Sequence, residues 1–97
     1  MKYKIKYLII ARDDLKGVRS YLSRFYPSTA SNFMKDLREQ VNLLKDTPLM
    51  CEEYHDDPYY RRMVAGDYLV FYHVDDGNRI VEIHRVLHGS RDIKQYI

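Results

Sequence analysis

Apolar residues recur at two different periods along this chain, and the change of period separates predicted strands from predicted helices. Near the start, Tyr3, Ile5 and Tyr7 alternate with lysines, which predicts a strand with its apolar side chains on one face. From Ala11 the apolar positions recur every three or four residues, which predicts an amphipathic helix that ends at Pro27. The apolar face of this helix comprises Leu15, Val18, Leu22 and Phe25.

A second amphipathic helix is predicted to follow, with Ser28 as its N-terminal cap and Pro48 beyond its end. Its apolar positions are Ala30, Phe33, Leu37, Val41 and Leu44. Each helix has a single apolar stripe, so the two should form an antiparallel hairpin that covers a sheet. Asp13 and Asp14, in the expected first turn of the first helix, suit the positive end of a helix dipole.

Three β-like runs occupy residues 61–92, and a glycine marks the expected end of each run. These glycines are Gly66, Gly77 and Gly89, and they predict an antiparallel meander. Together with the N-terminal strand, the meander makes a mainly antiparallel four-stranded sheet. The predicted fold class is therefore α+β, a single domain over residues 1–97, with the helical hairpin on one face of the sheet and a short C-terminal tail.

The two hairpin turns predict which side chains share a face of the sheet. A two-residue turn at Asp76 and Gly77 sets Tyr72 opposite Val81 and Leu69 opposite His84. The face under the helices then comprises Val70, Tyr72, Val74, Val81, Ile83 and Leu87. The other, mixed face comprises Leu69, Phe71, His73, Ile80, Glu82, His84, Val86 and His88.

Arg62 joins the mixed face if the turn at Gly66 sets it opposite Phe71 and sets Val64 opposite Leu69. A shift of one residue in that turn would place Arg61 there instead. A guanidinium, a carboxylate and imidazoles among apolar side chains are suited to binding a ligand. The alternative is a cross-strand ion pair between Arg62 and Glu82 on a solvated face, worth about 0 to 1 kcal/mol.

Composition narrows the class of protein. The chain has 97 residues, 31% charged and 45% hydrophobic, with a formal net charge of +2, which is typical of one globular domain and only weakly suggests a nucleic-acid partner. Its single cysteine, Cys51, excludes an internal disulfide. No membrane span or signal peptide is predicted, so we expect a cytoplasmic protein.

No metal or cofactor site is predicted. His84 and His88 lie four residues apart on one strand, about 13 Å, which is too far to share an ion. Residues 49–58 carry several carboxylates and His55, but their spacing matches no known metal loop. We interpret that segment as a solvated acidic connection.

Four motifs occur in order along the chain. They are the lysine-rich first strand, an Ala-x-x-Phe pattern in the second helix, YRR at residues 60–62 followed by GDYLVFY at 66–72, and RVLHGSRD at 85–92. Together they resemble the RelE/ParE superfamily of bacterial toxins from type II toxin–antitoxin modules, and the resemblance covers nearly the whole chain. The closing motif is more similar to the ParE and plasmid-stabilisation side of that superfamily.

The resemblance implies a toxin that inhibits growth and is neutralised by a cognate antitoxin, in a heterotetramer or larger complex. ParE-like members poison DNA gyrase, and this is the activity that we expect. RelE-like members are instead endoribonucleases that cut mRNA on the ribosome without a metal, and this is the alternative. A second alternative is a non-toxic module that binds nucleic acid or protein.

Metal-free RNA cleavage needs a base, an acid and at least one cationic group. Under the ribonuclease alternative, the resemblance implies these candidate catalytic residues: Arg62, His88, Arg91 and Tyr96, with His84 and Glu82 secondary. The chain departs from the RelE pattern at Tyr60 and Val64, where basic residues would be expected. The remaining positive charge is small for gripping RNA, which favours the ParE-like activity.

Overall fold

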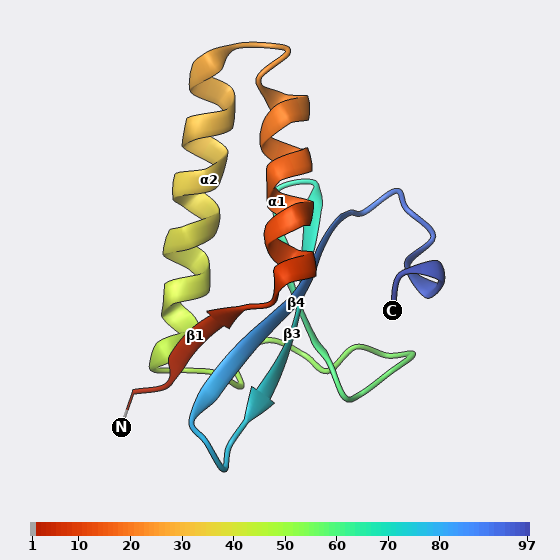
Figure 1. Cartoon of the computed structure of the whole chain (residues 1–97). Helices are drawn as coiled ribbons and strands as arrows, with labels where there is room; N and C mark the ends of the chain where they lie inside the picture. The colour runs from red at the N-terminus through yellow and green to blue at the C-terminus, as the bar shows by residue number, and fades with distance from the viewer. Residues whose placement is uncertain (1) are drawn as a thin grey trace.

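The computed structural model describes residues 2–97 as a four-stranded mixed sheet with a helical hairpin packed against it (Figure 1). The elements, in chain order, are β1 (Lys4–Tyr7), α1 (Ile9–Leu22), α2 (Pro27–Asn42), the 3-10 helix η1 (Leu43–Lys45), β2 (Arg61–Ala65), β3 (Tyr68–Asp75), β4 (Ile80–His88) and the 3-10 helix η2 (Ile93–Gln95). The strand order is β1-β4-β3-β2, with β1 parallel to β4 and the other pairs antiparallel. The predicted α+β fold class is confirmed.

Both ends of α1 differ from the prediction. This helix begins at Ile9, so Asp13 and Asp14 lie beyond its first turn and the dipole interpretation is wrong. It ends at Leu22, which leaves Phe25 outside the helix and 58% exposed. The aromatic ring of Phe25 packs edge-on against Tyr21 instead of entering the core.

Proline also has a different place from the one predicted. Pro27 is the first residue of α2, where a missing N–H costs no intrahelical hydrogen bond and the fixed φ suits the helix. The capping position is therefore Tyr26 and not Ser28. The predicted apolar face of the second helix is confirmed, because it packs into the core through Ala30, Phe33, Leu37 and Val41, and continues into η1 through Leu44.

The core lies between the helical hairpin and one face of the sheet. Helical residues supply Ala11, Val18, Leu37, Val41 and Leu44, and strand residues supply Met63, Ala65, Val70, Tyr72, Val81, Ile83 and Val86. Met63 is 4% exposed and belongs to this core. The phenol of Tyr72 is satisfied inside the protein, because its hydroxyl donates a hydrogen bond to the carbonyl of Pro48 (3.0 Å).

The β2–β3 register is confirmed, with Arg62 opposite Phe71 and Val64 opposite Leu69. Gly66, in this turn, has a φ of +59°, a left-handed conformation that glycine adopts without steric cost.

The predicted β3–β4 register is wrong by two residues near the turn, because a two-residue turn would pair Asp75 with Asn78. Asp75 pairs with Ile80, and four residues separate them. The Asp75 carboxylate accepts hydrogen bonds from the backbone and side chain of Asn78, which also hold the pKa of Asp75 below its usual value. Arg79, and not Gly77, takes the left-handed conformation (φ 55°). A side-chain-bonded loop therefore replaces the two-residue turn.

A β-bulge in β4 then changes which side chains share a face. Tyr72 pairs with Ile83 but Phe71 pairs with Arg85, so His84 has no partner in the register and alternation reverses beyond it. Val86 lies in the core and on the face of Val70, where the prediction placed Leu87. The prediction placed His88 on the mixed face with Glu82 and His84, and this is wrong. His88 lies on the helix side of the sheet, whereas Glu82 and His84 lie on the opposite side.

Candidate functional site

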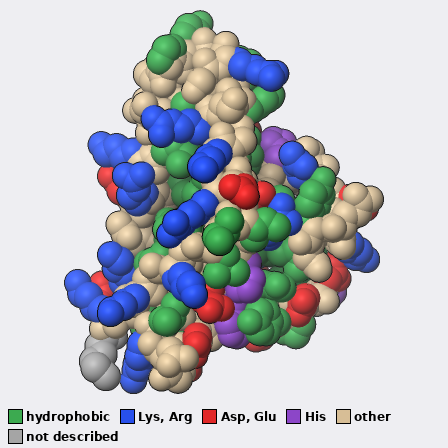
Figure 2. Space-filling model, in the orientation of Figure 1, with side chains coloured by type: hydrophobic (Ala, Val, Ile, Leu, Met, Phe, Trp, Pro, Cys, Tyr) green, Lys and Arg blue, Asp and Glu red, His purple; other side chains and the backbone are tan. Residues whose placement is uncertain are grey.

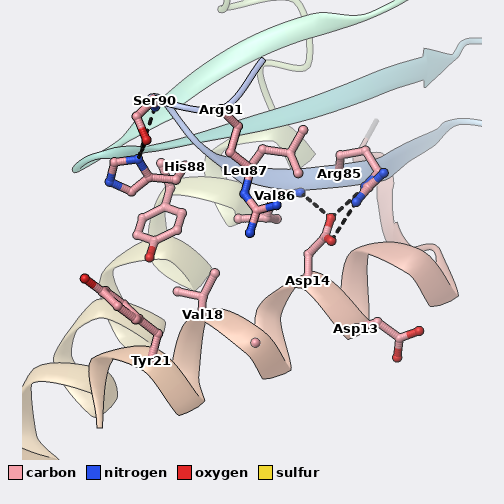
Figure 3. Close-up of a pocket in the computed structure, with 12 residues that line it drawn as sticks. Asp13, Asp14, Val18, Tyr21, Arg85, Val86, Leu87, His88, Ser90 and Arg91 are labelled. Atoms are coloured by element: carbon pink, nitrogen blue, oxygen red, sulfur yellow. Dashed lines mark hydrogen bonds and ion pairs between the residues drawn. The ribbon is translucent and has the colours of Figure 1, made fainter. Parts of the chain in front are cut away.

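A groove runs between α1 and the second half of β4, with the start of the C-terminal tail along its rim (Figure 3). This α1–β4 groove has a volume of about 490 Å³. It exists because β1 ends at Tyr7, opposite Ile83, so that α1 and not a strand lies beside the rest of β4. Its lining residues are Asp13, Asp14, Gly17, Val18, Tyr21, Tyr68, Arg85, Val86, Leu87, His88, Ser90 and Arg91.

The floor of the groove is fixed by Asp14. Its carboxylate accepts two parallel hydrogen bonds from Arg85, at 2.8 Å from Nε and 2.9 Å from Nη2, and a third from the backbone N–H of Val86 at 3.0 Å. Both side chains are about 15% exposed (15% and 14%). The hydrogen bonds that Arg85 donates to Asp14 raise the pKa of Arg85 above its usual value. This pair closes the open edge of β4 and holds the guanidinium in one orientation.

His88 lies at the other end of the groove. Its Nδ1 accepts the backbone N–H of Ser90 (3.1 Å) and lies 2.7 Å from the Ser90 hydroxyl. Because Nδ1 serves as an acceptor, the proton of the neutral ring belongs on Nε2. The ring packs edge-on against Tyr68, whose pKa burial raises. His88 is thus oriented by its surroundings, with Nε2 as the nitrogen left for another group.

Tyr96 lies beside the groove and contacts Arg85 and Arg91, which line it. The Arg91 guanidinium donates a hydrogen bond to the Tyr96 hydroxyl (2.9 Å), and the carbon at its centre lies 5.3 Å from the Tyr96 ring centroid. The Arg85 guanidinium lies at the same distance from this ring and bonds the Tyr96 carbonyl (3.3 Å). Cation–π contacts therefore anchor the tail on β4.

Glu82 and His84 lie on the face of the sheet away from the helices. His84 Nε2 is 3.3 Å from the Glu82 carboxylate, and its ring packs edge-on against Tyr60. His73 stacks on Tyr59 with ring centroids 3.8 Å apart. These side chains form a cluster of aromatic rings, imidazoles and a carboxylate on that face, and none of them lines the α1–β4 groove.

Of the candidate residues taken from the sequence, the structure brings together His88 and Arg91 in the groove, with Tyr96 bonded to Arg91. Arg62 is exposed on β2 and lies outside that groove. Asp14 and Arg85 were not predicted to be partners. No periodic signal could have found them, because they are 71 residues apart and meet only through the packing of α1 on β4.

Two further observations concern residues 2–97. None of their helices is both long and apolar enough to cross a membrane. They also include no group of three or more His, Cys, Asp or Glu side chains placed to hold a metal ion.

The sequence matches the family described as the ParE toxin of type II toxin–antitoxin system, parDE, over residues 5–93. The chain belongs to the ParE toxin family. The matched region contains both α-helices, β2, β3, β4, all of β1 except Lys4, and both sides of the α1–β4 groove. It stops short of the last residues of the tail. Comparison with curated protein sequences gave no significant match.

Solved structures show the same fold in other ParE and RelE toxins. A chain of the chromosomal ParDE toxin–antitoxin system of Pseudomonas aeruginosa has a TM-score of 0.77 at 18% identity, covering 90% of this chain and 96% of that one. The RelE–RelB complex of Pyrococcus horikoshii gives 0.66 at 20% identity, covering 94% and 99%. The RelBE2 complex of Mycobacterium tuberculosis gives 0.63 at 21% identity, covering 91% and 99%.

Proposed function

We propose that this ParE-family toxin arrests growth by inhibiting DNA gyrase and that a cognate antitoxin neutralises it. Three solved structures of similar fold belong to toxin–antitoxin systems, which supports an antitoxin as the partner. We expect the two proteins to form a heterotetramer or larger complex. The target is inferred from the arrangement of the candidate residues, as follows.

The observation that carries the proposal is the separation of the groups that RNA cleavage would require. Arg62 shares a face with His73, Glu82 and His84, whereas His88 lies on the helix side of the sheet. Two strand spacings separate Arg62 from β4, roughly 10 Å. A phosphorane needs its base, acid and cation within hydrogen-bond reach of one phosphate. These residues are therefore better suited to binding a protein target than to cutting RNA together.

The two arginines that line the α1–β4 groove support the same proposal, because both are engaged within the protein. Arg85 is bonded to Asp14, and Arg91 is bonded to Tyr96. Releasing either guanidinium to hold a developing charge would break these contacts.

The ribonuclease alternative is still supported by one local arrangement. His88 and Arg91 line the same groove, and Tyr96 lies against Arg91, so an acid or base, a cation and a phenol occur on neighbouring segments. A reduced site of this kind would use those three residues and not Arg62.

The test is inducible expression with and without the antitoxin gene, combined with two assays of the purified toxin. We expect gyrase supercoiling to fall as toxin is added and to recover when antitoxin is added. We expect no new cuts in mRNA on translating ribosomes. New cuts that disappear in the His88→Ala and Arg91→Ala variants, with supercoiling unaffected, would establish the alternative. Growth that is unchanged by the wild-type chain would contradict both toxin activities.

A further inference from the structure

A second and larger groove lies between β1 and the two helices, on a different side of α1 from the α1–β4 groove. This basic groove has a volume of about 780 Å³. Its lining residues are Lys2, Tyr3, Lys4, Ile5, Tyr7, Arg12, Leu15, Met34, Leu37, Arg38, Asn42 and Lys45.

The charge in this groove has one sign. Five of the chain's 16 Lys and Arg residues line it, and none of its 14 Asp and Glu residues does. Within residues 2–97, none of these five cations takes part in an ion pair. Asp76, bonded to the Tyr3 hydroxyl, lies at one end but outside the lining. The protein therefore maintains uncompensated positive charge here although its net charge is only +2.

The cations are also the groups that a ligand would meet first. Lys2, Lys4, Arg12 and Arg38 are exposed, whereas the apolar lining residues are half-buried or, for Leu37, buried. The apolar side chains thus belong mainly to the core beneath the groove. A surface of this kind favours a polyanion over an apolar peptide segment.

Positive charge continues from the groove along α1. Arg12, Lys16 and Arg19 follow one another at helical spacing, and all three are exposed. Seven residues of helix span about 10 Å, so this stripe lengthens the positive surface well beyond the groove. Figure 2 shows Lys and Arg side chains gathered over β1 and the two helices.

We propose that the basic groove binds the phosphate backbone of double-helical DNA. The choice of DNA rests on the proposed function, because a gyrase inhibitor acts on an enzyme that holds a DNA duplex. The lysines of β1 then have a role besides protecting a sheet edge. Contacts of this kind position a protein on a duplex without reading its sequence.

The salt dependence of binding gives the proposal a magnitude. Each phosphate neutralised on a duplex contributes about −0.9 to the slope of log affinity against log salt. Five contacts give a slope of roughly −4.5, so affinity should fall about 500-fold between 50 and 200 mM salt. With a slope of about −0.9, one phosphate contact makes the affinity at 0.1 M salt about eightfold higher than at 1 M salt. Removing two cations should therefore weaken binding at 0.1 M salt about 60-fold.

The experiment measures fluorescence anisotropy of a labelled 20-base-pair DNA duplex with the purified full chain between 50 and 200 mM NaCl. The groove variant is Arg12→Gln with Arg38→Gln. The control variant, Arg24→Gln with Lys94→Gln, removes the same charge from exposed positions outside the groove. At 0.1 M NaCl, we expect the groove variant to bind about 60-fold more weakly than the wild-type chain, with a salt slope smaller by about 2. We expect the control variant to change the slope by less than about 0.5. Thermal melting confirms that each variant is folded.

Several outcomes would overturn the proposal: no binding at 50 mM NaCl, equal losses in the groove and control variants, tighter binding of an RNA duplex, or binding of a poly-glutamate peptide in preference to DNA. Gyrase assays separate this proposal from the proposed function. If the groove variant inhibits supercoiling as strongly as the wild-type chain does, the basic groove has no role in the toxin's activity and gyrase is still its target. Groove-dependent DNA binding without inhibition of supercoiling would support DNA binding by the basic groove and contradict gyrase as the target.

Discussion

Replacing Asp14 by alanine should be among the most damaging single changes outside the main core. The Asp14 carboxylate holds Arg85 through two hydrogen bonds and the N–H of Val86 through a third. Its removal leaves a mostly buried guanidinium without its counter-ion, which in buried pairs costs about 3 to 5 kcal/mol. The pair here is about 15% exposed, and Arg85 keeps its contact with Tyr96, so we take the lower end.

We therefore expect Asp14→Ala to lower the free energy of unfolding by about 3 kcal/mol. For a domain of this size, that corresponds to a fall in melting temperature of roughly 12 to 24 °C. Urea unfolding followed by circular dichroism measures the free energy directly. The matched control is Asp13→Ala, one residue away, because Asp13 is exposed and takes part in neither ion pair found within residues 2–97. This change should alter the free energy of unfolding by less than about 0.5 kcal/mol.

A double-mutant cycle with Arg85→Ala isolates the pair from other effects. Removing both partners should cost less than the sum of the two single changes, with a coupling of about 1.5 kcal/mol or more. If Asp14→Ala and Asp13→Ala differ by less than 0.5 kcal/mol, the reasoning that Asp14 closes the edge of β4 is refuted.

Three other predictions concern the fold. Val86→Ala should lower the free energy of unfolding by about 1 to 2 kcal/mol, because Val86 is 2% exposed. Val64→Ala, at a strand position that is 61% exposed, should lower it by less than about 0.5 kcal/mol. Equal losses in urea unfolding would contradict the bulge in β4. Gly66→Ala should cost about 1 kcal/mol because of its positive φ, measured as a lower melting temperature. Burial raises the pKa of Tyr72 above its usual value of about 10, so the contribution of Tyr72 to the free energy of unfolding is complete below pH 10 and is lost as the pH rises above that value. Urea titrations repeated from pH 8 to 11 should therefore show a smaller loss of stability with pH for Tyr72→Phe than for the wild-type chain.

Periodicity and the glycine turn signals together predicted the helical hairpin on a four-stranded sheet, because each helix and each strand is long enough to repeat its pattern. Where the prediction failed, the cause was a local interaction that the pattern does not contain. Asp75 bonds Asn78 and extends the β3–β4 loop, although the Asp-Gly pair within it is typical of a shorter turn. The unpaired His84 shows no feature in the sequence that distinguishes it from its neighbours in β4.

The candidate site was less predictable than the fold for a related reason. A single extra residue in β4 moves His88 to the opposite face from His84, so an error of one position exchanges a whole set of neighbours. Arg91 and Tyr96 could be named from a motif, but their contact depends on how the tail folds back. The partnership of Asp14 with Arg85 depends on tertiary packing alone.

The parallel pairing of β1 with β4 has a consequence for the order in which the molecule assembles. Lys4 lies opposite Ile80, a separation of 76 positions (80 − 4), whereas the helical hairpin and the β2–β4 meander form from neighbouring segments. Closing a chain loop of that length costs about 4 kcal/mol in entropy before any contact is gained. The short N-terminal strand should therefore join late and detach early, and its departure would expose the edge of β4 to pairing with another chain.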